Sequence, residues 1–217
     1  MPTNDNKLTL PLLITRGLLV FPSMSESIDV GRAFSVKAVD EAKETTNSLI
    51  LVTAQKDSNM EEIKNPSEDL FMVASLCRIT SLIKKPDFYQ IRVYATKRVR
   101  LSNIHFEGGT YLADGEILED VLGDKNEEVQ LVRSIVDILA NNPSLGRDIP
   151  RGALNTLDHG ITPNDLSNTL AAYLQLNPEQ KEKVLATVDC NERLKIVLAY
   201  LNEQKEIATI DQKLNDT

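Results

Sequence analysis

The sequence contains few residues that bind metals or form disulfides, and no segment suited to crossing a membrane. Its only two cysteines, Cys77 and Cys190, are too far apart among 217 residues to suggest a disulfide framework, so we expect both to be buried as small apolar side chains. No apolar run approaches the roughly 20 residues that a membrane-spanning helix requires. The polar start from Met1 to Lys7 lacks the apolar stretch of a secretory signal. These absences predict a cytoplasmic protein without membrane contact.

Positive charge is also scarce, with 24 Lys and Arg against 32 Asp and Glu and a formal net charge of -8. Broad nucleic-acid binding needs a concentration of Lys and Arg that this composition does not offer. A small cationic surface is the exception to consider. Arg98 and Arg100 on one face of a predicted strand could join the Lys84-Lys85 turn and bind RNA or an acidic peptide, or could form an ordinary solvated sheet face.

The usual signatures of catalysis and of nucleotide binding are missing. None of the nine glycines precedes a lysine, which excludes a phosphate-binding loop, and the dinucleotide, serine-hydrolase and zinc-protease motifs are absent. His105 and His159 have no acidic or cysteine neighbour at ligand spacing, so both are expected to be solvated or capping residues. We therefore predict no catalytic, cofactor-binding or metal-binding residue. Paired carboxylates of an unrecognised hydrolase are the remaining alternative.

The first half of the chain has the pattern of short strands separated by turn residues. We expect strands at 8–14, at 18–21 before Pro22, at 48–54, at 71–83, in the alternating segment from Ile91 to Leu101, and at 111–118 after Gly108-Gly109. The polar turn at 84–87 makes the fourth of these and the segment after it a hairpin. One helix is expected after Gly31, where Phe34, Ala38, Val39 and Ala42 recur at helical spacing.

The second half has helical periodicity. One apolar stripe is formed by Val129, Val132, Ile135, Val136 and Leu139. Two further helix starts are indicated by Thr162-Pro163 and Asn177-Pro178, where a capping residue precedes a proline in the first turn. A last helix opens at Asn191 and carries Leu194, Val197, Leu198 and Leu201. It still reads as helix at Thr217, so we expect the natural polypeptide to continue. The predicted organisation is α+β: a flexible N-terminus at 1–7, a β-rich domain at 8–120, a linker at 121–126 and a helical region at 127–217.

Several short strings of the sequence resemble, in order, the N-terminal substrate-binding region of bacterial Lon ATP-dependent proteases. The strings are Leu10-Pro11-Leu12, Arg16-Gly17-Leu18, Val20-Phe21-Pro22, Val30-Gly31-Arg32, Ala54-Gln55-Lys56, Asp69-Leu70-Phe71, Thr96-Lys97-Arg98-Val99 and Asn191-Glu192-Arg193-Leu194. The likeness covers about residues 8 to 214. It implies a mainly-β PUA-like pseudo-barrel, then a helical bundle and the start of a long connecting helix.

The family's ATPase signature and its Ser-Lys catalytic dyad have no counterpart in this sequence, so ATP and Mg²⁺ would be bound only by an ATPase module outside it. What the resemblance implies for this chain is capture of unfolded or damaged proteins and help in arranging a hexamer. Met24, Arg32 and Phe34 are our predicted substrate contacts, although Phe34 could equally be a core anchor. The alternative function is a free-standing PUA-like adaptor that binds RNA or peptide and is not joined to a protease.

Overall fold

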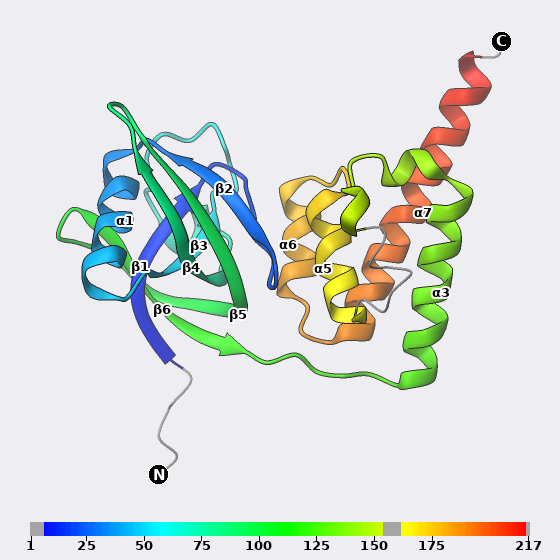
Figure 1. Cartoon of the computed structure of the whole chain (residues 1–217), viewed down its shortest axis with the longest axis horizontal. Coiled ribbons are helices and arrows are strands. Elements are labelled where there is room, and N and C mark those ends of the chain that lie inside the picture. The colour runs from blue at the N-terminus through cyan, green and yellow to red at the C-terminus, as the bar shows by residue number, and fades with distance from the viewer. Residues whose placement is uncertain (1–6, 154–161, 216–217) are drawn as a thin grey trace. The chain divides into compact units, whose positions relative to one another are not determined.

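The computed structural model describes residues 7–153 and 162–215, which fall into two compact units (Figure 1). The barrel unit comprises the described residues up to Glu119 together with Asn177–Ala186. The helical unit comprises the described residues of 120–176 and 187–215. The N-terminus predicted to be flexible lies outside the described residues except for Lys7, and so does His159.

The barrel unit is built from one sheet that closes on itself. Its described strands run in the order β2-β5-β4-β3-β1-β6, and β5 pairs with β6 as well. The strands are β1 (Lys7–Thr15), β2 (Ser25–Val30), β3 (Leu49–Ala54), β4 (Val73–Lys84), β5 (Tyr89–Glu107) and β6 (Thr110–Leu118). With 19 residues, β5 is long enough to pair with β2 through its first residues and with β6 through its last ones, and β4 pairs with it from Tyr89 to Arg100. The predicted mainly-β pseudo-barrel is confirmed.

Two apolar clusters fill the barrel unit. One gathers residues such as Leu13, Ile28 and Val93 with the buried face of helix α1 (Ala33–Thr45), and the other gathers Leu12, Leu51 and Val99. Successive side chains of a strand point to opposite faces, so neighbours such as Leu12 and Leu13 can enter different clusters. Both cysteines are buried, as predicted. A short helix, α2 (Pro66–Asp69), precedes β4.

The prediction of a strand at 18–21 was wrong. Leu19, Val20 and Phe21 are buried, but the segment has no strand partner. Instead, the hydroxyl of Thr15 donates to the carbonyl of Leu18 at 2.6 Å, and the hydroxyl of Ser75 donates to the carbonyl of Val20. These side chains satisfy backbone acceptors that a neighbouring strand would otherwise have to satisfy. An apolar run can therefore enter the core as irregular chain.

The predicted placement of Arg98 beside Arg100 on an exposed face was also wrong. The pairing of β4 with β5 shifts register between Leu76 and Cys77, and such a shift changes which side chains face the core. Arg98 is only 2% exposed, and its Nε donates to the carbonyl of Leu185 at 2.9 Å, whereas Arg100 is exposed. The Lys84-Lys85 turn lies at the far end of β5, about 30 Å of strand away. No joint cationic surface forms from these residues.

Helix α6 (Pro178–Ala186) groups with the barrel, although the sequence division placed residues 177–186 in the helical region. A reciprocal capping box between Asn177 and Gln180 starts the helix, as the sequence predicted. Arg98 on β5 donates to the carbonyl of Leu185 in this helix. In addition, Glu182 Oε1 accepts from the backbone N of Val73, the first residue of β4, at 3.3 Å. Because these partners come from β4 and β5, tertiary contacts rather than position in the sequence decide where α6 belongs.

The helical unit packs α3 (Lys125–Asn141) and α5 (Pro163–Tyr173) along α7 (Cys190–Asn215), with the short 3-10 helix η1 (Pro143–Gly146) after α3 (Figure 1). Asp124 and Thr162 cap α3 and α5 by accepting from the backbone N of Glu127 and Asp165. Leu194, Val197 and Leu201 are buried, as expected. In the predicted α3 stripe, however, Val129 is exposed and Ile135 is the buried position.

A buried arginine connects the start of α7 to Asp120, the residue immediately before the segment predicted as a linker. Arg193 is 0% exposed, and its guanidinium donates to Asp120 at 2.9 Å, to Asn164 at 2.6 Å and to the carbonyl of Thr187 at 3.1 Å. Val121 also pairs with Asp189 as a parallel bridge. The segment from Asp120 to Asp124 is therefore fixed by specific hydrogen bonds, because it supplies partners for polar groups around the first turn of α7.

Candidate functional site

Arg32 lies where β2 passes into α1. It is the N-cap residue of α1, and its guanidinium donates to the Gln55 side chain and, at 2.5 Å, to the carbonyl of Ile14. The same guanidinium lies 4.8 Å from the centre of the Phe34 ring. Burial lowers the pKa of Arg32, and the neighbouring charge of Arg16 lowers it further. Arg32 thus holds three segments together while keeping its cationic plane over an aromatic ring.

Phe34 belongs to a row of three aromatic side chains. Its ring meets that of Tyr111 edge to face at 5.3 Å, and Tyr111 meets Phe106 at 5.1 Å. We call Phe34, Tyr111 and Phe106 the aromatic row. Phe34 is half-buried, whereas Phe106 is 59% exposed. The row therefore runs from the edge of the core into solvent, with aromatic pairs in a geometry that contributes beyond the area they bury.

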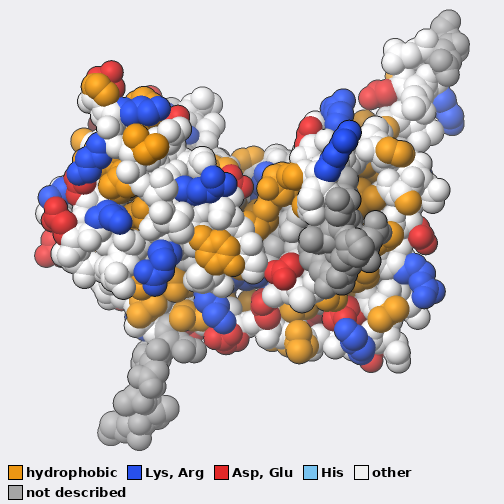
Figure 2. Space-filling model, viewed as in Figure 1, with side chains coloured by type: hydrophobic (Ala, Val, Ile, Leu, Met, Phe, Trp, Pro, Cys, Tyr) orange, Lys and Arg blue, Asp and Glu red, His pale blue; other side chains and the backbone are white. Residues whose placement is uncertain are grey.

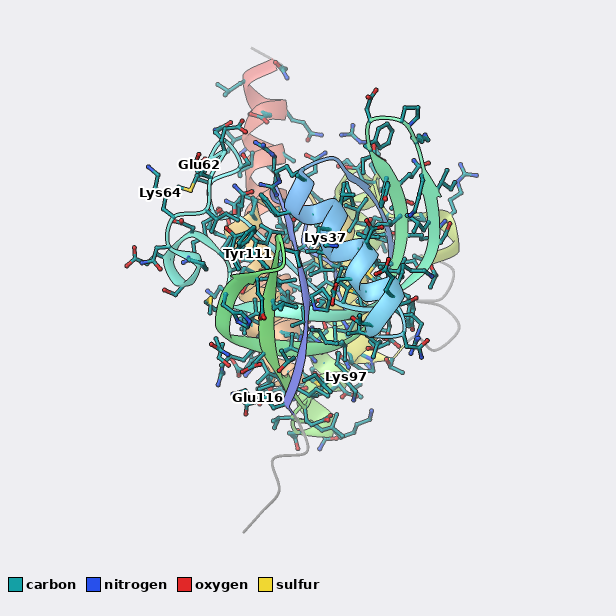
Figure 3. The ribbon with its side chains drawn as sticks, turned by 90° about the vertical axis from the view of Figure 1, so that its left-hand side faces the viewer. Lys37, Glu62, Lys64, Lys97, Tyr111 and Glu116 are labelled. Carbon is teal, nitrogen blue, oxygen red and sulfur yellow. The ribbon has the colours of Figure 1, made fainter. Side chains whose placement is uncertain are left out.

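Two contacts fix the row to the fold. The Thr110 hydroxyl donates to the carbonyl of Phe34 at 2.8 Å, which joins the β5–β6 hairpin to the first turn of α1. Phe106 and Tyr111 are direct cross-strand partners in that hairpin, the arrangement in which strand side chains interact most closely. Figure 3 shows Tyr111 beside α1, from which Lys37 projects. Burial raises the pKa of Tyr111, so its hydroxyl stays protonated at neutral pH.

Sequence reasoning missed Tyr111 and Phe106. The signal for them was present, because the predicted Gly108-Gly109 turn has one aromatic residue close on each side. Gly108 and Gly109 have φ values of +62° and +85°, which glycine adopts at little cost. Such a turn places the flanking residues opposite each other, and the register of the hairpin could have identified the pair.

The structure brings Arg32 and Phe34 together but does not bring Met24 to them. Met24 lies immediately before β2, and Arg32 lies two residues beyond its other end. Extended chain of that length separates the two by roughly 25 Å. All three side chains are at least partly exposed, and their role as substrate contacts stays a prediction.

A pocket of about 480 Å³ opens beside Arg32. It lies between the end of β1, the segment that follows it, β2 and the first turn of α1. Its lining is Leu13, Ile14, Thr15, Arg16, Leu18, Ser27, Ile28, Asp29, Val30, Gly31, Arg32 and Ser35. The hydroxyl of Ser35 is buried and has no hydrogen-bond partner among the described residues. A pocket lined by apolar side chains and by residues of a strand, with Arg16 and Arg32 among its lining, suits a segment of polypeptide.

The described residues contain no group of three or more His, Cys, Asp or Glu side chains placed to hold a metal ion. His105 pairs with Glu107 at 3.4 Å near the tip of the β5–β6 hairpin.

In the space-filling view, apolar side chains occur in small groups among charged ones (Figure 2). Among the residues that the structure places, no helix is both long and apolar enough to span a membrane.

The family comparison matches residues 9–203 to the substrate-binding domain of the ATP-dependent protease La, or LON. The chain belongs to the Lon substrate-binding domain family. Three curated relatives bear the name Lon protease. That of Brevibacillus choshinensis is 27% identical over 100% of this chain, that of Escherichia coli K12 is 28% identical over 99%, and Lon protease 2 of Thermus thermophilus is 34% identical over 94%. The chain spans about a quarter of the length of these relatives, 25% to 28%.

Solved structures of Lon N-terminal domains share the fold. The N-terminal domain of a Mycobacterium avium complex Lon protease superposes with a TM-score of 0.67, covering 90% of this chain and 98% of the other at 17% identity. A Lon N-terminal domain protein from Xanthomonas campestris gives 0.58, covering 89% and 98% at 19% identity. These likenesses confirm the predicted fold class of a β-rich part followed by helices.

Proposed function

We propose that this chain is the non-catalytic, substrate-recognition region of an ATP-dependent Lon protease that degrades misfolded, damaged and regulatory proteins. The observation that carries the proposal is the aromatic row, which presents Phe106 to solvent at one end and places Phe34 against the Arg32 guanidinium at the other. Unfolded proteins expose apolar side chains that folded proteins bury, so such a surface favours them. Family membership and the names of the relatives support this reading.

Capture by one copy is expected to be weak. Binding orders a disordered client, and the entropy lost offsets much of the apolar area buried. Several copies in a hexamer would compensate, because linked weak sites gain avidity of roughly 10²- to 10⁴-fold without any new contact. On this proposal ATP and Mg²⁺ act in an ATPase module of the full-length protease, cleavage occurs at its Ser-Lys site, and the assembly is cytoplasmic.

The free-standing adaptor is less well supported. The cationic surface that Arg98 and Arg100 were considered to offer to RNA does not form, because Arg98 is buried. The family match is to the substrate-binding domain of a protease. No observation on the structure favours an adaptor over substrate capture.

A binding titration tests the role of the aromatic row. A reduced and carboxymethylated protein, which cannot fold, and the same protein in its native form would each be titrated into the chain and followed by amide NMR shifts. We expect only the unfolded form to bind. Phe106→Ala should weaken that binding about 5- to 10-fold, because an exposed aromatic ring loses its contact with the client. Phe34→Ala should weaken it as well, without unfolding the barrel unit.

The matched control is Ile83→Ala. Ile83 is 52% exposed in the β4–β5 hairpin of the same unit, so the substitution removes a similar apolar side chain away from the aromatic row. If Ile83→Ala weakens binding as much as Phe106→Ala, capture is not located at the row. If Phe34→Ala abolishes cooperative melting, Phe34 is a core anchor and the binding role rests on Phe106 and Tyr111.

A further inference from the structure

The outer edge of β2 is unpaired and faces the pocket beside Arg32. Among the described strands β2 ends the sheet order and pairs only with β5. Five consecutive residues from Ser27 to Gly31 line the pocket, together with Leu13 to Arg16 on its opposite side. A run of consecutive residues means that the backbone of β2, and not only one face of its side chains, borders the pocket.

The hydrogen bonds identify which backbone groups point outward. Ala95 on β5 donates from its N to the carbonyl of Met24 at 2.9 Å and accepts from the N of Ser23 at 2.8 Å, so the Met24 carbonyl is directed toward β5. Antiparallel pairs alternate, and the register matches Glu26 with Val93 and Ile28 with Ile91. Those residues therefore bond to β5. Ser27 and Asp29, the residues between and beyond them, direct their backbone N–H and C=O groups to the free edge.

A second observation inside the pocket also points to a polar ligand. The Ser35 side chain is 3% exposed, and its Oγ is buried without a hydrogen-bond partner among the described residues. Buried polar groups are nearly always paired, so an unpaired hydroxyl in the pocket wall suggests that a ligand completes it. Leu13, Leu18 and Ile28 make the rest of the floor apolar.

An extended polypeptide has the groups that these features require. Its backbone donors and acceptors match a strand edge, and alternate side chains point toward and away from the pocket floor. β2 is short and carries Asp29, which is how exposed edges avoid pairing with copies of themselves, so the edge is accessible without being generally adhesive. Arg16 and Arg32 are also among the lining residues, so a bound segment would lie beside positive charge, which suits the carbonyl oxygens of a peptide.

We propose that an unfolded client segment binds as an additional antiparallel or parallel strand along the free edge of β2, with every second side chain over the pocket. This inference rests on the proposed function and specifies its ligand: extended segments with apolar residues at every second position and no proline among them. The aromatic row then acts as a separate apolar contact, and the edge of β2 supplies recognition of the backbone.

Amide hydrogen exchange on the intact chain tests the inference, using a peptide of alternating valine and threonine flanked by lysines. In the free chain the amides of Ser27 and Asp29 should exchange quickly, whereas those of Ile28 and Val30 should be protected by β5. At saturating peptide we expect the exchange of Ser27 and Asp29 to slow at least 10-fold. Unchanged exchange at these two amides, with the peptide bound, overturns the strand proposal.

Two further arms separate this inference from the capture function. Two peptides would be N-methylated, one at the odd-numbered and one at the even-numbered residues. Only one of these two sets of backbone N–H groups faces β2, so one peptide should lose binding and the other should keep its affinity within about 3-fold. Asp29→Pro, which removes an outward N–H, should weaken the peptide at least 10-fold. If neither change matters while Phe106→Ala weakens binding, capture stands and strand addition is wrong. If neither the peptide nor an unfolded protein binds, both proposals fail.

Discussion

The two units of the chain are stabilised in different ways. The barrel unit gathers strands from distant parts of the sequence around two apolar clusters, and its buried polar side chains such as Thr53, Ser75 and Arg98 each donate to a backbone carbonyl. The helical unit forms from helices whose caps are encoded locally, and its centre includes the buried Arg193 bonded to Asp120, Asn164 and Thr187. Both units bury apolar side chains, but in the helical unit one buried arginine also joins several polar partners at the start of α7.

This difference suggests how each unit tolerates change. Apolar clusters accept substitutions that keep volume and pattern, because their contacts are numerous and weakly directional. A buried charged cluster depends on all its partners being present, because each unpaired group then bears its full desolvation cost. We expect single polar substitutions to unfold the helical unit more readily than comparable changes at the edge of the barrel.

Arg193→Ala should show the largest effect. It removes the donors for Asp120, Asn164 and the Thr187 carbonyl at once, so we expect a loss of about 3–5 kcal/mol in the free energy of unfolding of the helical unit. Arg98→Ala in the barrel unit, which breaks the bond to the Leu185 carbonyl, should cost roughly 2–3 kcal/mol and loosen α6. Amide hydrogen exchange assigns each loss to its unit. Equal losses spread over both units would contradict the contrast between them.

Glu182 gives the barrel unit a dependence on pH. Burial raises the pKa of its carboxyl to about 8, whereas in the unfolded chain it is near the ordinary 4.5. The folded unit therefore holds this proton more tightly than the unfolded chain does. The contribution of the protonated Glu182 to the free energy of unfolding is complete below about pH 4.5 and is lost as the pH rises toward 8 and above. Each unit of raised pKa corresponds to about 1.4 kcal/mol.

The variant Glu182→Gln isolates this effect, because glutamine keeps the acceptor for Val73 N but does not ionise. Urea unfolding between pH 5 and pH 8.5 should show the wild-type barrel unit losing stability relative to the variant as the pH rises. Parallel curves for the two proteins would mean that Glu182 is solvated and that α6 is not held as described.

A pair of glycine substitutions gives the smallest expected effect. A Cβ at Gly123 would overlap the Asn191 side chain, which donates to the Asp124 carbonyl at 3.0 Å, so Gly123→Ala should cost the helical unit about 1–2 kcal/mol. At Gly115 the Cβ would lie 3.1 Å from Leu51 in the barrel core, and the cost of overpacking should be about 1 kcal/mol. Thermal unfolding followed by NMR separates the two. A larger loss of stability for Gly115→Ala than for Gly123→Ala would show that the side chains of the barrel core move aside less easily than Asn191 does.

Much of the fold was readable from the sequence because its signals are local. The alternation around Ile91 and Val93, the helical spacing of Ala38, Val39 and Ala42, and the caps at Thr162 and Asn177 each depend on residues a few positions apart. For the candidate site, Arg32 and Phe34 were named from their position at the start of a predicted helix. Tyr111 and Phe106 were not named, because the contact of the aromatic row with α1 joins residues about 75 positions apart.

The sequence by itself determined the order of strands and helices, the absence of familiar catalytic motifs and the resemblance to Lon proteases. Only the tertiary structure decided that Arg98 is buried, that α6 groups with the barrel, that Arg193 fixes the segment after Glu119, and that the edge of β2 faces a pocket. The physical reason is the same in each case. Local periodicity shows which side of an element is apolar, but burial of a charge or exposure of an edge depends on which distant residues provide the partners.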